Sequence, residues 1–195
     1  MLTKIDGQML AEAFSLEHHL AAVSAGNATA RLLASRQWTE RFAVNAQGQC
    51  VLIPVRLHFA SERLPLSISD EAWLFARALQ TRSNDGFERQ RAVRDLLADL
   101  RPWAAPFIVA LIGEYIVEIL NDISAALTDE NTQTLATFIL QNEGFWNTTK
   151  RRVASYWNVY YRSNGCSELR HAYRRDEYIG FKITDRIEMA AFGRT

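Results

Sequence analysis

Three carboxylates recur at every fourth position in the most hydrophobic stretch of the chain, residues 107–127. They are Glu114, Glu118 and Asp122. On an α-helix such side chains lie along one face, where carboxylates can coordinate a divalent cation or share a proton. A di-metal site in a helical bundle needs two Glu-x-x-His motifs, whereas this chain has one, Glu168 with His171. We interpret the row as the solvated edge of a buried helix and retain a metal site as the alternative.

A cysteine and a histidine near residue 170 are the candidates for nucleophilic catalysis. Cys166 precedes Ser167, a suitable helix N-cap, and His171 follows one turn later. A helix N-terminus favours the reactive thiolate, yet free cysteines are more often packing residues. The sequence contains no glycine-rich phosphate loop, nucleophile elbow or HExxH motif. We therefore assign no catalytic residue and no cofactor, and an enzyme with a Cys–His or carboxylate–metal site is the third hypothesis.

The stretch KRRVASYWNVYYR, residues 150–162, places cations beside aromatic side chains. From residue 150 to residue 175 the only carboxylate is Glu168, and the cations of this segment are the candidates for binding nucleic acid or another anion. They are Lys150, Arg151, Arg152, Arg162, Arg170, Arg174 and Arg175. Residues 105–149, in contrast, carry six carboxylates and no lysine or arginine. The net charge of zero therefore conceals an acidic segment followed by a basic one.

This charge division has two interpretations. In the first, the two segments pack together and pair their charges, which contributes about 0 to 1 kcal/mol per exposed pair. In the second, the basic segment faces solvent and binds an anion or a partner. Lys150, Arg151 and Arg152 would stand in the first turn of a helix that begins near Thr148, where the helix dipole disfavours cations. Nearby carboxylates or a bound phosphate would then have to offset the unfavourable interaction of these three cations with the helix dipole.

The same helix, taken over residues 148–163, is predicted to be amphipathic. At ~100° per residue, its apolar and aromatic side chains occupy an arc of about 140°. They are Val153, Tyr156, Trp157, Tyr160 and Tyr161. Arg151 and Arg162 lie on the opposite side. We therefore predict a buried aromatic stripe rather than the interleaved aromatics and cations of a base-stacking platform.

The elements that position these residues are expected to be mainly helical. A first helix should follow Asp6 as its N-cap and end near Gly26, because apolar residues recur every three or four positions. The best hairpin signal lies at about residues 41–59, where β-branched and aromatic residues flank a polar turn at Gly48. Pro54 cannot donate a ladder hydrogen bond and places its strand at an edge.

Capping residues mark the starts of the other predicted helices. We expect N-caps at Ser69 or Asp70 and capping residues at Thr128, Asp129 and Glu130, and we also interpret Asn27 and Asn147 as N-caps rather than as glycosylation sites.

A mainly α, compact multi-helix domain with one small β-hairpin is therefore predicted. With 195 residues, 48% of them hydrophobic and 23% charged, the chain should form one globular domain over residues 1–195. Possible sub-parts are residues 1–66, with helices and the hairpin, and the helical residues 67–195. Within the second, YIGFKIT at 178–184 is predicted to be a short strand.

No feature of the sequence identifies a reaction. The chain has no apolar run of about 18 residues and no secretory signal, so we expect a cytoplasmic protein without membrane contact. The leading hypothesis is a non-catalytic helical interaction or adaptor protein that binds a protein partner or a copy of itself. The alternative is a nucleic-acid-binding or phosphate-binding protein that uses the basic helices at 148–175.

Overall fold

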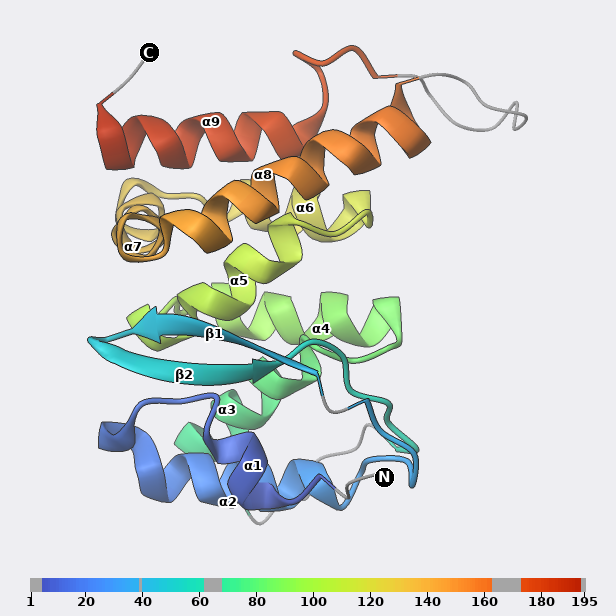
Figure 1. Cartoon of the computed structure of the whole chain (residues 1–195), viewed down its shortest axis with the longest axis vertical. Helices are drawn as coiled ribbons and strands as arrows, with labels where there is room; N and C mark the ends of the chain where they lie inside the picture. Colours follow the sequence, from blue (N-terminus) through green and yellow to red (C-terminus); the bar gives the residue numbers. More distant parts are fainter. Residues whose placement is uncertain (1–4, 39, 62–67, 163–172, 194–195) are drawn as a thin grey trace. The chain divides into compact units, whose positions relative to one another are not determined.

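The computed structural model describes residues 5–38, 40–61, 68–162 and 173–193. These residues are mainly helical, and they contain one antiparallel hairpin (Figure 1). The predicted fold class is therefore confirmed. The chain divides into two compact units, Met1–Phe107 and Ile108–Thr195. A single domain over the whole chain remains a prediction.

The N-terminal unit begins with two short helices where one was predicted. α1 (Gly7–Ala11) has the predicted cap, because Oδ1 of Asp6 accepts a hydrogen bond of 2.8 Å from the Met9 amide. The chain then turns through η1 (Leu16–His18) into α2 (His19–Ala30). Apolar spacing predicted helix correctly on both sides of this turn, but it could not locate the turn itself.

Two glycines allow α1 and α2 to pack at close range. A Cβ atom at Gly26 would lie 2.1 Å from the carbonyl oxygen of Gly7, and a Cβ atom at Gly7 would lie 2.1 Å from the Asn27 side chain. Gly26 therefore permits a helix contact and does not end a helix. Asn27 lies inside α2, so its prediction as an N-cap is wrong.

The predicted hairpin consists of β1 (Arg41–Ala46) and β2 (Gln49–Pro54). Its two-residue turn is formed by Gln47 and Gly48, whose φ angles are 53° and 77°. Positive φ at both positions matches the twist of the paired strands. Pro54 ends the second strand, where its missing N–H interrupts no ladder.

A helical hairpin completes the N-terminal unit. α3 (Asp70–Gln80) has the predicted cap, since the Ser69 hydroxyl accepts a hydrogen bond from the first turn. α4 (Gly86–Leu97) is capped by Asp85 in the same way. The short helix η2 (Pro102–Ala104) follows and leads out of the unit.

Charged side chains are buried between α3 and α4. Glu88 is only 2% exposed, and one of its carboxylate oxygens lies 2.6 Å from Nη1 of Arg77. Its other oxygen lies 2.7 Å from Nη2 of Arg91. Nε of Arg77 also contacts Asp95 at 2.6 Å. Because Arg77 and Glu88 are both removed from water, each depends on the other for its electrostatic stabilisation.

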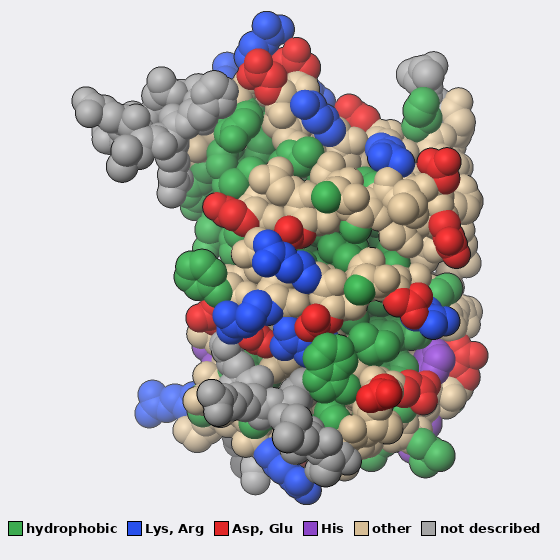
Figure 2. Space-filling model, turned by 180° about the vertical axis from the view of Figure 1, so that it is seen from behind, with side chains coloured by type: hydrophobic (Ala, Val, Ile, Leu, Met, Phe, Trp, Pro, Cys, Tyr) green, Lys and Arg blue, Asp and Glu red, His purple; other side chains and the backbone are tan. Residues whose placement is uncertain are grey.

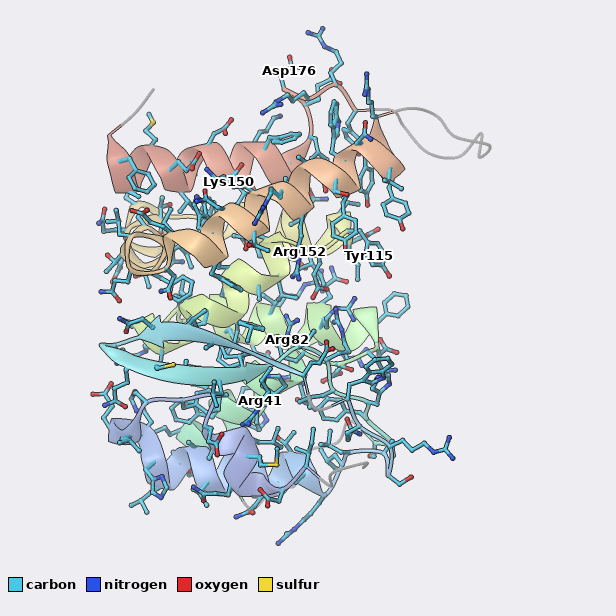
Figure 3. The ribbon with its side chains drawn as sticks, viewed as in Figure 1. Arg41, Arg82, Tyr115, Lys150, Arg152 and Asp176 are labelled. Atoms are coloured by element: carbon cyan, nitrogen blue, oxygen red, sulfur yellow. The ribbon has the colours of Figure 1, made fainter. Side chains whose placement is uncertain are left out.

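Buried arginines also hold the loops of this unit. Arg82, labelled in Figure 3, donates hydrogen bonds of 3.2 and 2.7 Å to the carbonyl oxygens of Pro54 and Val55. Arg89 donates one of 2.7 Å to the carbonyl oxygen of Ser83. These guanidinium groups satisfy backbone acceptors at the end of β2 and between α3 and α4, and so connect the hairpin to the helices.

The described residues of the C-terminal unit form helices joined by turns, without a strand. Its helices are α6 (Val117–Ala125), α7 (Asp129–Gln141), α8 (Glu143–Tyr156) and α9 (Ile179–Phe192). The preceding helix α5 (Ala105–Ile112) spans the boundary between the units. α8 continues into a π-helical turn, η3 (Trp157–Tyr161). Of the three predicted capping residues, Thr128 is the N-cap of α7, because its hydroxyl accepts a hydrogen bond of 3.1 Å from the Asn131 amide, and Asp129 and Glu130 lie in the first turn.

The final helix packs against the three before it, α6, α7 and α8 (Figure 1). The prediction of a short strand at 178–184 is wrong, because these residues open α9. Gly180, Ile183 and Ile187 are buried, a spacing of three and four that a helix satisfies and a strand does not.

We predict that Glu88→Ala will lower the free energy of unfolding by about 3 to 5 kcal/mol, because it removes the buried carboxylate of the network and leaves Arg77 only the more exposed Asp95 as a charged partner. Urea denaturation followed by circular dichroism would measure this change. The matched control is Asp99→Ala, which removes an exposed ion pair with Arg101 and should cost about 0 to 1 kcal/mol. If both variants lowered the free energy of unfolding equally, the stronger effect that we expect for the buried ion pair would be contradicted.

Candidate interaction surface

The carboxylate row does not lie on one helix. α5 ends at Ile112 and α6 begins at Val117, so Glu114 lies in the intervening turn while Glu118 and Asp122 lie on α6. Glu114 is buried and Glu118 is exposed. Across the residues that the structure describes, no group of three or more histidine, cysteine, aspartate or glutamate side chains is placed to hold a metal ion. The geometric basis of the metal hypothesis is therefore lost.

The helix α5 ends just before Gly113, which lies at ordinary van der Waals distance from α8. A Cβ atom at this position would lie 3.4 Å from Cγ2 of Thr149 and 3.5 Å from Cδ of Arg152. Glycine also destabilises a helix interior by about 1 kcal/mol relative to alanine. The turn places Tyr115, which was not among the predicted site residues, next to α8.

The first three cations of the basic segment lie in the middle of a helix. α8 begins at Glu143, so Lys150, Arg151 and Arg152 are more than a turn from its N-terminus, and the argument from the helix dipole is wrong. Asn147 likewise lies within α8 and is not an N-cap. The hydroxyls of the two threonines that follow it bond back to carbonyl oxygens of the preceding turn, which is compatible with a continuing helix.

Lys150 is paired, but with α9 rather than with the acidic segment. Its Nζ lies 2.5 Å from Oε1 of Glu188, and the same oxygen accepts a hydrogen bond of 3.0 Å from Nε1 of the buried Trp146. The positive charge of Lys150 therefore supports the packing of α8 against α9.

The remaining cations of the segment are dispersed. Arg174 contacts Asp176 at 3.2 Å, and the guanidinium groups of Arg162 and Arg175 lie over aromatic rings at 5.7 and 4.5 Å. Arg151 donates a hydrogen bond to Thr148 within its own helix. The predicted site residue Arg170 and the candidate pair Cys166 and His171 lie outside the described residues.

A groove of about 760 Å³ between α8 and α9 brings three of the predicted cations together. Lys150, Arg151 and Arg175 line it, but so do Asp185 and Glu188. On the face that Figure 2 presents, blue cationic and red acidic side chains are also interspersed. The groove is therefore of mixed charge and is not a dedicated anion site.

The aromatic stripe of α8 and η3 is only partly buried. Val153 is buried as predicted, but Tyr160 is 40% exposed and Tyr156 is half-buried. Tyr115, at 48% exposed, joins them from the turn between α5 and α6. The prediction that the whole stripe is buried is therefore wrong, because the core ends before the helix does.

The three tyrosines contact one another. The ring centroid of Tyr115 lies 5.7 Å from that of Tyr156 and 5.6 Å from that of Tyr160. The centroids of Tyr156 and Tyr160 lie 6.0 Å apart. Arg152 stands one turn before Tyr156 on α8, is exposed, and neighbours the turn that carries Tyr115 (Figure 3). We call Arg152, Tyr115, Tyr156 and Tyr160 the tyrosine surface.

Inward-facing aromatic residues hold this surface in place. Tyr161 donates a hydrogen bond to the carbonyl oxygen of Tyr115, which ties the turn to the end of α8. Its ring stacks on the buried Tyr178 with a centroid distance of 5.0 Å. Nε1 of Trp157 donates a hydrogen bond of 2.9 Å to the carbonyl oxygen of Tyr173. One face of η3, with Trp157 and Tyr161, therefore packs on neighbouring residues, and the other, with Tyr160, faces solvent.

The buried side chain of Tyr178 includes a hydroxyl group that is removed from water. Its hydroxyl has no hydrogen-bond partner among the described residues. Burial, with a smaller contribution from neighbouring Tyr161, raises the pKa of Tyr178 well above its usual range. The phenol must therefore stay protonated in the native protein.

Comparisons with models of protein families, with curated proteins and with solved structures found no match to this chain. Within its described residues, no helix is long and apolar enough to cross a membrane. Function must therefore be inferred from the site itself.

We predict that Tyr178→Phe will raise the free energy of unfolding at neutral pH by about 1 kcal/mol, because it removes a buried hydroxyl that lacks a partner. The variant should also change how the free energy of unfolding depends on pH in the alkaline range. Because the native pKa of Tyr178 lies above the unfolded value of 10.0, the wild type loses stability as pH rises past that value, and the variant should lose less.

Urea denaturation at neutral pH and at several alkaline pH values would test this expectation. Tyr161→Phe is the matched control, since it removes a hydroxyl that is hydrogen-bonded and should destabilise the protein. A destabilised Tyr178→Phe with an unchanged pH dependence in the alkaline range would contradict the prediction.

Proposed function

We propose that this protein is a non-catalytic interaction protein, an adaptor that binds a protein partner through the tyrosine surface. The observation that carries the proposal is the cluster of three partly exposed tyrosines beside an exposed arginine. The chain has two cysteines, Cys50 and Cys166, which are not spaced as a pair of metal ligands. This low cysteine content favours a reducing compartment such as the cytoplasm.

The composition of the tyrosine surface supports a protein partner. Tyrosine, tryptophan and arginine are the residues most enriched among those that contribute most to protein–protein binding. A tyrosine ring offers a large apolar area and a polar hydroxyl, and it has few rotatable bonds to immobilise. These properties suit a surface that is exposed in the free protein and covered in a complex.

The rigidity of the surface is a second point in its favour. The hydrogen bond from Tyr161 restrains the backbone at Tyr115, and the stack of Tyr161 on Tyr178 restrains η3. Restraint in the free protein lowers the conformational entropy lost on binding. A π-helical turn is also a feature that occurs frequently at functional sites.

A photo-crosslinking amino acid in place of Tyr160 tests the proposal in the full-length chain. We expect it to form a defined protein adduct in cells, because the ring it replaces would lie in the interface. Tyr115→Ala in the same chain should reduce the adduct by roughly 30-fold, as expected for a contact of about 2 kcal/mol.

The matched control for this experiment places the same crosslinker at Phe87, an exposed aromatic residue in the N-terminal unit with 75% of its surface accessible. This position should not yield the same adduct. Identical adducts from both positions, or an adduct unaffected by Tyr115→Ala, would count against an interface at the tyrosine surface.

A second candidate function is nucleic-acid or phosphate binding by the basic segment. It is favoured by the exposure of Arg151, Arg152 and Arg162 on the helical stretch that carries the partly exposed tyrosine rings. Stacking on such rings and neutralisation of phosphates are the two contributions to single-strand binding.

This second function predicts that a fluorescent single-stranded oligonucleotide binds at low salt, that its affinity falls steeply as salt rises, and that Arg151→Glu with Arg162→Glu abolishes binding. Fluorescence anisotropy would measure each of these effects. Absence of binding at low salt would rule this function out.

A further inference from the structure

We propose that the tyrosine surface binds a short proline-rich segment in the polyproline II conformation that carries an acidic residue at one end. This inference rests on the proposed function and specifies the chemistry of the partner. It follows from the length of the surface, the arrangement of its rings, its hydroxyl groups and the position of Arg152.

The length of the surface suits a four-residue segment. Arg152, Tyr156 and Tyr160 follow one another at intervals of four residues along α8 and η3. At about 1.5 Å per residue they span roughly 12 Å. A polyproline II helix rises about 3.1 Å per residue, so this distance corresponds to about four residues, the length of a P-x-x-P motif.

The orientation of the rings suits flat proline side chains. The ring planes of Tyr156 and Tyr160 are inclined by 30° and those of Tyr115 and Tyr160 by 32°, while those of Tyr115 and Tyr156 are inclined by 55°. Neighbouring rings at small angles present faces and edges in a similar direction. Aromatic surfaces of this kind are what proline-rich segments dock against, because these segments are ordered before binding and lose little entropy.

The tyrosine hydroxyls supply the polar contacts that such a ligand requires. Within the described part of the chain, no hydrogen bond occupies the hydroxyls of Tyr115, Tyr156 or Tyr160. A polyproline II segment has no internal hydrogen bonds, so its carbonyl oxygens are available as acceptors. Hydroxyl donors on aromatic rings therefore complement both the apolar and the polar parts of this ligand.

The charge at one end of the surface predicts the acidic residue. Arg152 is exposed, and no carboxylate among the described residues forms an ion pair with it. Arg162, near the other end, already donates to Asn158 at 3.0 Å and lies over Trp157. An acidic residue next to the prolines would therefore be recognised by Arg152, by a charge-assisted and bidentate contact.

An amphipathic helix fits the surface less well. Such a ligand buries apolar residues at positions i, i+3, i+4 and i+7, over several turns. The apolar part of the tyrosine surface extends over one helical turn, from Tyr156 to Tyr160, with Tyr115 beside it. The described groove between α8 and α9 is lined by other residues, with mixed charges.

The experiment measures binding of the full chain to a library of short synthetic peptides with the pattern P-x-x-P and an acidic residue at either end. We expect micromolar or weaker binding by fluorescence anisotropy, with chemical-shift changes at the three tyrosines. Tyr156→Ala and Tyr160→Ala should each weaken binding by at least about tenfold, and Tyr160→Phe by less because the ring remains. Arg152→Ala should weaken binding only for peptides that contain the acidic residue.

Two control peptides make the outcome decisive. Replacement of the prolines by alanine should abolish binding, and so should a scrambled peptide of equal charge. Equal binding of the alanine peptide, binding insensitive to Tyr156→Ala, or no binding by any library member would overturn the proposal.

The partner segment crosslinked at position 160 separates this proposal from the proposed function. A proline-rich segment with an acidic residue supports both. A specific protein adduct in a segment without proline, or in a helix, overturns the polyproline proposal but leaves the interaction function standing. If the crosslinker at position 160 reacts with an oligonucleotide and forms no protein adduct, both the polyproline proposal and the proposed interaction function are overturned.

Discussion

The stack of Tyr161 on Tyr178 is the contact on which the C-terminal site depends. Tyr161 lies at the end of η3, Tyr178 caps the start of α9, and the Tyr161 hydroxyl donates to the carbonyl oxygen of Tyr115. Three segments that are distant in the sequence are thereby held at one place. The hydroxyl of Tyr178 has no hydrogen-bond partner among the described residues, but its buried ring packs against Tyr161 and Phe181.

Burial decides what the charges of this protein can do. In the N-terminal unit, Glu88 and Arg77 are almost completely removed from water, so their pairing is a strong constraint on how α3 and α4 pack. In the C-terminal unit, the basic residues lie near solvent, where ion pairs are worth little. Lys150, held beside Trp146 by Glu188, has a clear structural role. Arg151, Arg152 and Arg162 are exposed.

Sequence patterns predicted local features well where one side chain determines them. The caps at Asp6, Ser69 and Thr128 and the turn at Gly48 were all predicted from the residue that makes the hydrogen bond or adopts positive φ. Predictions failed where a distant contact decided the outcome. Gly26 was expected near a helix end, but it lies inside α2, where it permits a close approach to Gly7. The strand predicted at 178–184 is a helix because the other helices bury one side of it.

The sequence by itself determined that this protein is mainly helical, that it has one hairpin, and that acidic and basic residues are segregated along the chain, since these properties follow from local spacing and composition. Only the tertiary structure decided which aromatic residues are exposed. Helical periodicity places Tyr156 and Tyr160 on one face, but the depth of the core beneath that face depends on residues elsewhere in the chain. Tyr115 joins them because α5 ends at Ile112 and the turn before α6 lies in contact distance of α8.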